Sequence, residues 1–460
     1  MQGRVDEAAA AMEGQLISGR PQTEWRGASL DSRTVRGAEL FFALPGEQSD
    51  GHLYVGAALE RGASAVVVDR EVEAPEGAGV IRVADTFAAL HLLTREVRRR
   101  TPSHLVAVTG SIGKTTTKEL LAAMLACRFK VARNPGNLNN LLGFPIALLG
   151  IPEDTEWMVA EMGMSTPGEL GRISRLGRPD VAVLINIRPV HLEFFGSLRA
   201  IAEAKAEILE GLAPGGVLVA NRDDPEVARI ARGFQGKVVW FGIDQPAEVR
   251  ADKIESAAPD AGTRFVLTLG TESGQIHLPL YGRYNVENCL AAAACASHLG
   301  VSLAEIRAGL MTVDPLAGRG IVHRLSADRV VIDDSHNSNP VALSRALESA
   351  RALPAKRHWV VLGDMLELGE GAADYHLAAG REAAELGFEP VIGVGELARE
   401  IVAGAGEADT QGLWFEDALE AARELRDRLE PGDVVLVKGS RGVALEGVVD
   451  SLLAEAEGGD

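Results

Sequence analysis

The stretch HLVAVTGSIGKTTTKELLAAMLACRF, residues 104–129, decides the fold of this chain. It opens with a continuous apolar run, LVAVTG at 105–110, which is typical of a strand buried on both faces of a sheet. It closes with KELLAAMLACRF at 118–129, which reads as helical sequence. A strand, a glycine-containing turn and a helix in this order predict one βα unit of a parallel sheet.

The turn of this unit, GSIGKTT at 110–116, has the composition of a phosphate-binding loop. Glycines let the backbone curl until its N–H groups face phosphate oxygens, and the start of a helix adds partial positive charge. The order G-x-x-G-K-T departs from the common G-x-x-x-x-G-K-[ST], because Val108 stands in the place of the first glycine. The residues expected to bind nucleotide phosphates are Gly110, Ser111, Ile112, Gly113, Lys114, Thr115 and Thr116.

The same alternation of strand and helix continues after this unit. WMVAEMG (157–163) and DVAVLINI (180–187) predict two further buried strands of the same sheet. Proline and glycine then cluster at 312–320, and a second set of strands begins beyond them. The strands predicted in this second set are RVVIDDS (329–335), HWVVLGD (358–364), EPVIGVG (389–395) and DVVLVKG (433–439).

Before the phosphate loop, short strands are predicted in three segments, and a helix over 90–97 ends in basic residues before Pro102. These segments are ELFFALPG (39–46), SAVVVDR (64–70) and GVIRVAD (79–85). The chain is therefore predicted to be an α/β protein of three domains: a small N-terminal α/β domain at 1–100, a central parallel-sheet P-loop ATPase domain at 101–315, and a C-terminal Rossmann-like, doubly wound domain at 316–460.

Composition excludes several classes of protein. The 460 residues carry 46 basic and 65 acidic side chains, a net charge of −19, which argues against a protein that coats nucleic acid or an anionic membrane. No run of apolar residues reaches the length of about eighteen that crosses a bilayer, so we expect a cytoplasmic protein. Three cysteines, Cys127, Cys289 and Cys295, lie in Ala/Leu-rich stretches and are expected to be buried thiols.

Three side chains are candidates for a metal site, each with an alternative that the residues alone leave open. Glu161 ends an apolar strand and could ligate Mg²⁺ or turn to solvent. His191 follows the strand 180–187, and by itself such a histidine is more often a loop residue than a metal ligand. Lys205 lies in a helical stretch, where a lysine is normally a solvated surface residue.

Several segments, in this order along the chain, resemble the Mur ligases, and within them the branch that adds D-alanyl-D-alanine to UDP-N-acetylmuramoyl-tripeptide. The segment DSRTVRGAELFFALPGEQSDGH (31–52) resembles the uridine-nucleotide domain of that family. The other matching segments are TGSIGKTTTKE (109–119), GNLNN (136–140), AEMGMSTPGEL (160–170), NIRPVHLEFFGS (186–197), AKAEIL (204–209), IDDSHNSNP (332–340), VLGDMLELG (361–369) and VKGSR (437–441).

The resemblance implies an ATP-dependent ligase of peptidoglycan precursor synthesis that forms an acyl phosphate, and it implies two Mg²⁺ ions. Thr115 and Glu161 would hold one ion, and His191 would share the second with Glu161. Lys205 matches a lysine that these ligases carbamylate, which would make it a metal ligand. The catalytic residues implied are Lys114, Glu161, His191, Lys205 and Arg319. The partners implied are the tripeptide nucleotide and D-Ala-D-Ala, with no nucleic acid or membrane, and we expect a monomer.

The resemblance also assigns binding residues outside the phosphate loop. Those implied for ATP are Asn285, Asn288, Arg319, Asp334 and Asn337; those implied for the substrate are Ser32, Arg33, Asn137, Asn139 and Asn140. Lys438, Ser440 and Arg441 follow a predicted strand, and we expect them to bind a carboxylate of the dipeptide. Asn285 fits the N-cap of a helix equally well.

The sequence departs from the family pattern at Ile112, Tyr284, His336, the pair at 141–142, and Arg188 beside His191. None of these departures removes a proposed ligand.

The sequence is compatible with three other interpretations. A folylpolyglutamate-synthase-like ligase would share the central chemistry, and a nucleotide-gated switch would share the phosphate loop. Gly393-Val394-Gly395-Glu396-Leu397-Ala398 also matches the G-x-G-x-x-A turn of NAD-binding proteins, with Asp417 near the place of the ribose-binding acid. The segment at 31–52 disfavours the first reading, and the absence of an N-K-x-D motif disfavours the second.

Overall fold

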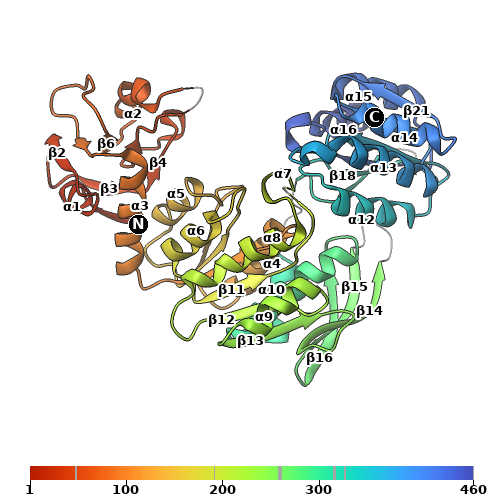
Figure 1. Ribbon diagram of the computed structural model, residues 1–460, viewed down its shortest axis with the longest axis horizontal. Helices are drawn as coiled ribbons and strands as arrows, with labels where there is room; N and C mark the ends of the chain where they lie inside the picture. Colours follow the sequence, from red (N-terminus) through yellow and green to blue (C-terminus); the bar gives the residue numbers. More distant parts are fainter. Residues whose placement is uncertain (47–48, 191, 257–261, 314–316, 326–327, 459–460) are drawn as a thin grey trace.

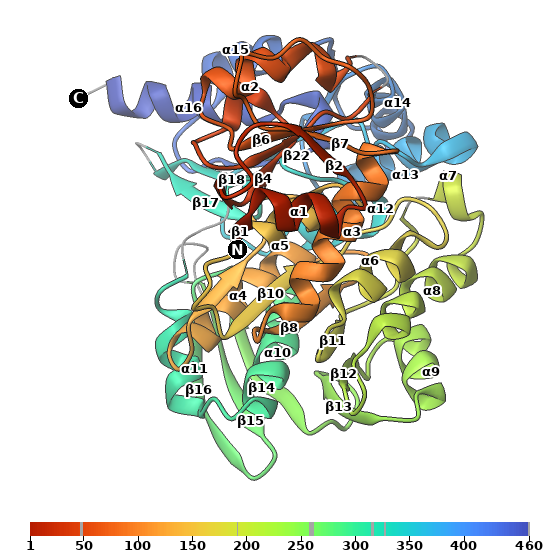
Figure 2. The same cartoon turned by 90° about the vertical axis from the view of Figure 1, so that its left-hand side faces the viewer.

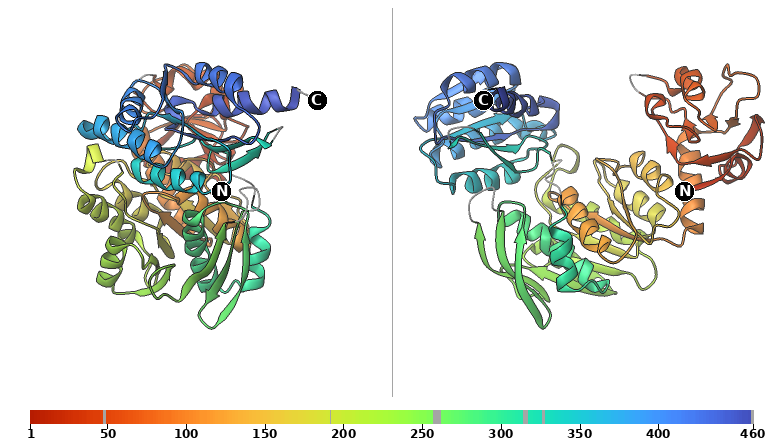
Figure 3. Two further views of the ribbon diagram at one scale, coloured as in Figure 1. Left: turned by 90° about the vertical axis from the view of Figure 1, so that its right-hand side faces the viewer. Right: turned by 180° about the vertical axis from the view of Figure 1, so that it is seen from behind.

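The computed structural model describes residues 1–46, 49–190, 192–256, 262–313, 317–325 and 328–458, which form three lobes (Figure 1). The N-terminal and C-terminal lobes rise from the same side of the central lobe and stand apart from each other in two opposite views (Figures 1 and 3). Within these residues, no helix has the length and apolar character needed to cross a membrane.

The N-terminal lobe is built on a five-stranded sheet of order β2-β7-β6-β5-β4, parallel except for β2, beside a two-stranded β1-β3 pair. Its helix α3 packs against α5 and α6 of the central lobe (Figure 2). Its elements are β1 (Gln2–Arg4), α1 (Val5–Ala11), β2 (Gln15–Ser18), β3 (Glu24–Arg26), β4 (Ala28–Ser29), η1 (Ser32–Thr34), β5 (Leu40–Phe42), η2 (Gly51–Tyr54), α2 (Val55–Glu60), β6 (Ala65–Val68), β7 (Val80–Arg82) and α3 (Thr86–Arg100).

The central lobe is built on a nine-stranded sheet of order β16-β15-β14-β13-β12-β11-β8-β10-β9. Its strands are β8 (His104–Thr109), β9 (Val131–Arg133), β10 (Trp157–Glu161), β11 (Val181–Leu184), β12 (Val217–Asn221), β13 (Lys237–Gly242), β14 (Val249–Ser256), β15 (Thr263–Leu269) and β16 (Glu272–Leu278). Its helices are α4 (Lys114–Ala126), α5 (Gly143–Leu149), α6 (Glu169–Gly177), α7 (Leu192–Phe195), α8 (Leu198–Ala206), η3 (Glu207–Gly211), α9 (Pro225–Gly233), α10 (Arg283–His298) and α11 (Leu303–Leu310).

The strand that carries the phosphate loop lies inside this sheet, between β10 and β11, and pairs in parallel with both. Side chains of α4, α10 and α11 form the core on one face, and those of α5, α6, α8 and α9 form the core on the other. The carboxyl ends of β8, β10 and β11 therefore meet at one edge, where open α/β sheets bind their ligands.

The C-terminal lobe is built on a six-stranded sheet of order β17-β18-β22-β19-β20-β21, in which only β17 is antiparallel to its neighbour. Helices α12, α13 and α14 cover one face, and α15 and α16 cover the other. The elements are β17 (Ile321–Arg324), β18 (Val330–Asp334), α12 (Pro340–Arg351), β19 (His358–Gly363), η6 (Gly369–Gly371), α13 (Ala372–Glu385), β20 (Val391–Val394), α14 (Ala398–Glu407), β21 (Gly412–Phe415), α15 (Ala418–Arg428), β22 (Val434–Lys438), η7 (Arg441–Val443) and α16 (Glu446–Gly458).

The predicted α/β class, with a parallel central sheet and a doubly wound C-terminal sheet, is confirmed. Several strands were not predicted, among them β15 and β16, which extend the central sheet with antiparallel strands. One expectation about the thiols was wrong. Cys289 and Cys295 are buried, but Cys127 is exposed, because it follows the last turn of α4, where the helix leaves the core.

Candidate active site

A cavity of about 450 Å³ lies between the central and C-terminal lobes, over the carboxyl ends of β8, β10, β18 and β22. Both lobes contribute polar side chains to its wall. The sequence-predicted residues that line it are Ser111, Ile112, Gly113, Lys114, Thr115, Thr116, Asn137, Asn139, Asn140, Glu161, Asn285, Asn288, Arg319, Asp334, Asn337, Lys438, Ser440 and Arg441. The structure thus brings together side chains that lie more than 300 residues apart in the sequence.

Gly113 gives the phosphate loop its shape. Its φ of +82° lies in the left-handed region, which only glycine adopts without strain. A Cβ atom at this position would lie 2.1 Å from Oδ1 of Asn288, so α10 and the loop approach each other as closely as glycine permits. Helix α4 begins at the next residue, and the amides of its first turn have no acceptor within the helix. The loop is therefore built to present N–H groups to an anion.

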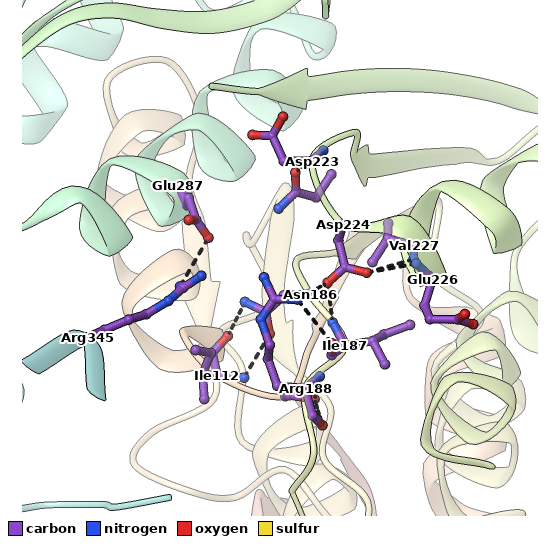
Figure 4. A network of polar contacts seen from close by, with 12 residues as sticks. Ile112, Asn186, Ile187, Arg188, Asp223, Asp224, Glu226, Val227, Glu287 and Arg345 are labelled. Atoms are coloured by element: carbon purple, nitrogen blue, oxygen red, sulfur yellow. Dashed lines mark hydrogen bonds and ion pairs between the residues drawn. The ribbon is translucent and has the colours of Figure 1, made fainter. Parts of the chain in front are cut away.

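Asn186 holds the first half of the loop (Figure 4). Its side chain accepts a hydrogen bond from the amide of Ile112 and donates one to the Ile112 carbonyl, at 3.0 and 3.1 Å. Its backbone carbonyl accepts from the amide of Ser111 at 3.0 Å. The Ser111 hydroxyl in turn bonds both backbone groups of Arg188. The amides that point to a ligand are thus those from Gly113 onward, and Asn186 is a functional residue that the sequence analysis missed.

Glu161 is buried, 3% exposed, at the end of β10. Its carboxylate accepts hydrogen bonds from the Thr115 hydroxyl and the Asn139 amide, both at 2.7 Å. Asn134 fixes its backbone by accepting from the Glu161 amide and donating to the Glu161 carbonyl. Lys118, fully buried, donates to the carbonyl of Asn134. The open alternative of a Glu161 turned to solvent is excluded.

Two lysines meet at the carbonyl of Gly110. Lys114 donates to the carbonyls of Gly110 and Ser111, and Lys205 donates to that of Gly110 at 3.0 Å. Lys205 is only 2% exposed, which excludes the reading of a solvated surface lysine. Burial lowers the pKa of Lys205 well below its usual value, and the neighbouring Lys114 ammonium lowers it further. Burial also lowers the pKa of Lys114, against the opposing effect of Glu161.

The donor set around Glu161 fits Mg²⁺. A buried carboxylate, a hydroxyl and an amide carry hard oxygen atoms, and the hydrogen-bond donors to the carboxylate among the described residues, Thr115 and Asn139, are neutral. His191 lies outside the described residues. Within the described residues, no group of three or more His, Cys, Asp or Glu side chains gathers as a metal site.

Asn285 and Asn288 lie buried on the first turns of α10 and face the cavity. The alternative that Asn285 caps this helix is wrong, because Gly282 occupies the N-cap position. Instead, Asn285 donates to the carbonyl of Tyr281 and accepts from the amide of Asn288 at 3.2 Å. This leaves amide and carbonyl groups of both side chains for a ligand with both donors and acceptors.

The C-terminal lobe contributes Arg319, Asp334 and Asn337. Asp333 accepts hydrogen bonds from the amide of Gly318 and so fixes the turn that carries Arg319. Burial lowers the pKa of Arg319 and raises that of Asp334, although Lys438 opposes the shift of Asp334. The ammonium of Lys438 is bound to the Asp334 carboxylate at 2.6 Å and to the Asn337 carbonyl at 2.9 Å.

The three residues expected to bind a dipeptide carboxylate differ in whether they already have partners within the protein. Lys438 is already neutralised by Asp334, and the Ser440 hydroxyl accepts from the amide of Leu366 at 3.0 Å. Arg441 is exposed at the cavity wall, and no carboxylate among the described residues pairs with it. Of the three, Arg441 is the group best placed for an incoming carboxylate.

Other predicted residues lie outside this cavity. Gly110 contributes only its carbonyl to the lysines, and Lys205 lies behind the loop. Ser32 and Arg33 form η1 in the N-terminal lobe, where the exposed Arg33 pairs with Asp31.

The turn at 393–398, which matches the NAD-binding pattern, has a structural role in the C-terminal lobe. The Asp364 carboxylate accepts a hydrogen bond from the amide of Ala398, the first residue of α14. A Cβ atom at Gly395 would lie 2.7 Å from this carboxylate. Asp417 caps α15. A carboxylate thus lies at the start of α14, which disfavours an anionic pyrophosphate there.

Three family models match consecutive parts of the chain. They are described as the Mur ligase family, catalytic domain (residues 24–98), the Mur ligase middle domain (108–296) and the Mur ligase, glutamate ligase domain (318–441). The UDP-N-acetylmuramoyl-tripeptide–D-alanyl-D-alanine ligase of Bacillus subtilis is 34% identical over 457 residues, which cover 98% of this chain and 98% of that protein.

Solved structures agree with this likeness. A MurF crystal structure from Acinetobacter baumannii superposes with a TM-score of 0.89 at 31% identity and covers 99% of both chains. MurF from Thermotoga maritima, solved in complex with ADP, gives a TM-score of 0.82 at 28% identity and covers 95% of this chain and 99% of that one.

Proposed function

Because the chain belongs to the Mur ligase family, we propose that it is the ligase of that family that joins D-alanyl-D-alanine to UDP-N-acetylmuramoyl-tripeptide at the expense of ATP. The single observation that carries this proposal is the cavity in which a phosphate loop, a buried carboxylate and cationic groups of two lobes converge. Two anionic substrates can meet there only if their charges are neutralised at close range.

The reaction is the one that the resemblance to the Mur ligases implies, and the groups that face the cavity can support it. The terminal carboxylate of the tripeptide attacks the γ-phosphorus of ATP, which forms an acyl phosphate and releases ADP. The dipeptide amine then attacks the acyl carbon, and phosphate leaves with one of the former carboxylate oxygens. The amides of the first turn of α4 and the ammonium of Lys114 would stabilise charge on the transferred phosphoryl group, and Arg319 would reach it from the C-terminal lobe.

Mg²⁺ would be held by Thr115 and Glu161, with His191 joining Glu161 at a second ion, and would neutralise the phosphate oxygens. We propose that Lys205 is carbamylated. Carbon dioxide reacts with a neutral amine, and burial favours the neutral form of Lys205. A carbamate carbon signal after growth in ¹³C-bicarbonate, lost in Lys205→Met, tests this; no difference between the two proteins would refute it.

The remaining ligand-binding roles are assigned lobe by lobe. We propose residues 1–100 for the uridine nucleotide through Ser32 and Arg33, 101–315 for ATP and the muramoyl peptide, and 316–460 for closure and the dipeptide. Asn285 and Asn288 would contact the adenine edge, and Asp334 and Asn337 the ribose and phosphates. Asn137, Asn139 and Asn140 would contact the muramoyl substrate; Asn139 already bonds Glu161.

Arg441→Ala should raise the KM for D-Ala-D-Ala by about tenfold or more, since a charge-assisted hydrogen bond to a carboxylate would be lost. The KM for ATP should change much less. Initial rates at varied dipeptide concentration check this, and an unchanged dipeptide KM would remove Arg441 from the site.

The proposed function is tested by phosphate release from ATP. Release that requires both the tripeptide nucleotide and D-Ala-D-Ala, with formation of the pentapeptide nucleotide, is the expected result. Release with a folate and glutamate would instead favour the folylpolyglutamate-synthase-like reading, and binding of ATP without turnover would favour the switch. Parallel assays with diaminopimelate- and lysine-containing nucleotides identify the third residue of the peptide. We also propose that the enzyme acts as a cytoplasmic monomer, which a solution mass of 48.7 kDa would support.

A further inference from the structure

The central and C-terminal lobes contact each other along a seam between the start of α10 and one face of α12, and two contacts of different chemistry lie in this seam. At the first, Tyr281 of the central lobe belongs to the hydrophobic core of the C-terminal lobe. Its hydroxyl donates to the carbonyl of Ser349 at 3.1 Å. At the second, the carboxylate of Glu287 accepts from the guanidinium of Arg345 at 3.4 Å (Figure 4).

The spacing shows that both points belong to one interface. Arg345 and Ser349 are four residues apart on α12 and so lie on the same side of that helix. Tyr281 and Glu287 are six residues apart at the start of α10. The two segments run in opposite directions along the seam, because the earlier residue of one meets the later residue of the other. An apolar anchor and an ion pair therefore fix the same two elements.

The ion pair lies at the cavity, whereas the anchor does not. Both Glu287 and Arg345 line the cavity, and Asn285 and Asn288 flank Glu287 on the same helix. Burial raises the pKa of Glu287, while Arg345 and Arg188 act in the opposite direction and Asp223 adds to the increase. With side chains only 15% and 26% exposed, the pair is better shielded from solvent than a surface ion pair.

Arg188 links this pair to the phosphate loop. Its guanidinium is bound to the buried Asp224 at 2.6 Å, and its backbone bonds the hydroxyl of Ser111. The charges that face Glu287 are thus fixed in the central lobe, and the only one that comes from the C-terminal lobe, among the described residues, is Arg345. Movement of the C-terminal lobe about Tyr281 would therefore change the distance between Glu287 and Arg345.

We propose that Glu287 and Arg345 are positioning residues that set the orientation of the C-terminal lobe over the ATP site, with Tyr281 as the pivot. This proposal rests on the proposed function only for its kinetic readout. The pair would keep Arg319 and Asp334, which come from the same lobe as Arg345, within reach of ATP bound to the phosphate loop. Without it, ATP would have to order the lobe on binding, which weakens its apparent affinity.

A double-mutant cycle tests the proposal. Glu287→Gln and Arg345→Gln should each raise the KM for ATP roughly three- to tenfold and leave kcat within about twofold, and the double variant should be no worse than either single one. Arg345→Lys should keep most of the wild-type behaviour, because only one guanidinium nitrogen contacts Glu287. Asp244→Asn is the matched control, since it removes an ion pair to Arg283 that lies on α10 but within the central lobe.

If Arg345 instead bound ATP directly, its replacement would raise the KM for ATP by the same factor in the wild type and in Glu287→Gln. Such additive effects would overturn the proposal. A control variant that raises the KM as much as the pair variants would overturn it too.

Lobe orientation gives a readout that does not depend on the reaction. The exposed Cys127 and a cysteine introduced at the exposed Asp427 of α15 can carry a fluorescent donor and acceptor, since Cys289 and Cys295 are buried. In nucleotide-free protein, the single variants should shift or broaden the distribution of energy-transfer efficiency between the two dyes, whereas Asp244→Asn should not. An unchanged distribution would refute the positioning role even if the ligase assay failed.

Discussion

At the scale of single residues, Glu161 shows how closely the protein's own side chains fix the groups of the site. Its two carboxylate oxygens are already held by Thr115 and Asn139, and its backbone by Asn134. The sequence indicated Glu161 because a carboxylate at the end of a buried strand needs a partner. Asn186 carried the same signal, a polar residue directly after a buried strand, and could have been found by it. Asn134 and Lys118 could not, because their roles depend on loop conformation.

Gly113→Ala should abolish ATP binding at concentrations that saturate the wild type. The new Cβ would clash with Asn288 at 2.1 Å, and alanine at a φ of +82° is strained, so the loop and α10 must separate. Calorimetric titration with a non-hydrolysable ATP analogue checks this. Gly215→Ala is the control, because that glycine also has a positive φ but an added Cβ meets no atom within 4 Å. Wild-type affinity in Gly113→Ala would contradict the assigned loop geometry.

At the scale of elements, the buried strands were the most predictable part. Apolar runs gave β8, β10 and β11 and four strands of the C-terminal lobe, β18, β19, β20 and β22, because strands covered on both faces carry few polar residues; the parallel edge strand β21 was not predicted. The antiparallel strands β15 and β16 were missed, since polar residues such as Glu272 and Gln275 alternate there with buried ones. The contact between Glu287 and Arg345 could not be predicted from the sequence, because it depends on how the central and C-terminal lobes are arranged.

Helix α13 holds a loop of the cavity through His376, and this contact should depend on pH. Nδ1 of His376 donates to the carbonyl of Ala372, and Nε2 accepts from the amide of Met365, next to the cavity residue Leu366. Burial lowers the pKa of His376, against smaller opposing effects of Ala372, Asp364 and Glu400. Protonation would turn Nε2 into a donor and break the bond to Met365.

The sign of the effect follows from linkage. Between the lowered pKa of the folded protein and the ordinary value of 6.5, the unfolded chain binds more protons, so the free energy of unfolding falls as the pH falls through this window. Urea unfolding between about pH 7.5 and about pH 5.5 should show a smaller loss of stability in His376→Phe than in the wild type. Equal losses in the two proteins would show that His376 does not contribute.

At the scale of the whole molecule, the net charge and the arrangement of the lobes both bear on how anionic substrates are brought together. The net charge is −19, and both the nucleotide and the peptide substrate are anionic, so attraction at long range cannot gather them. Cationic groups at short range must do so, and they come from separate lobes: Lys114 from the central one, Arg319 and Arg441 from the C-terminal one. The N-terminal lobe, with Ser32 and Arg33, stands apart from the C-terminal lobe (Figure 1).

Substrates should therefore draw the lobes together. Small-angle scattering should show a smaller radius of gyration when a non-hydrolysable ATP analogue and the tripeptide nucleotide are both bound, with less change for either alone. Glu287→Gln should start from a broader distribution of shapes and still close with both ligands. An unchanged radius with both sites occupied would contradict closure.

The measurement that tests the central claim most directly is oxygen transfer from the peptide to phosphate. The tripeptide nucleotide is labelled with ¹⁸O in its terminal carboxylate and turned over with ATP and D-Ala-D-Ala, and the released phosphate is analysed by mass spectrometry. Attack of the carboxylate on ATP predicts one peptide-derived oxygen in each phosphate and loss of that oxygen from the amide product. Phosphate without the label would contradict an acyl phosphate, and with it the role assigned to the cavity around Lys114 and Glu161.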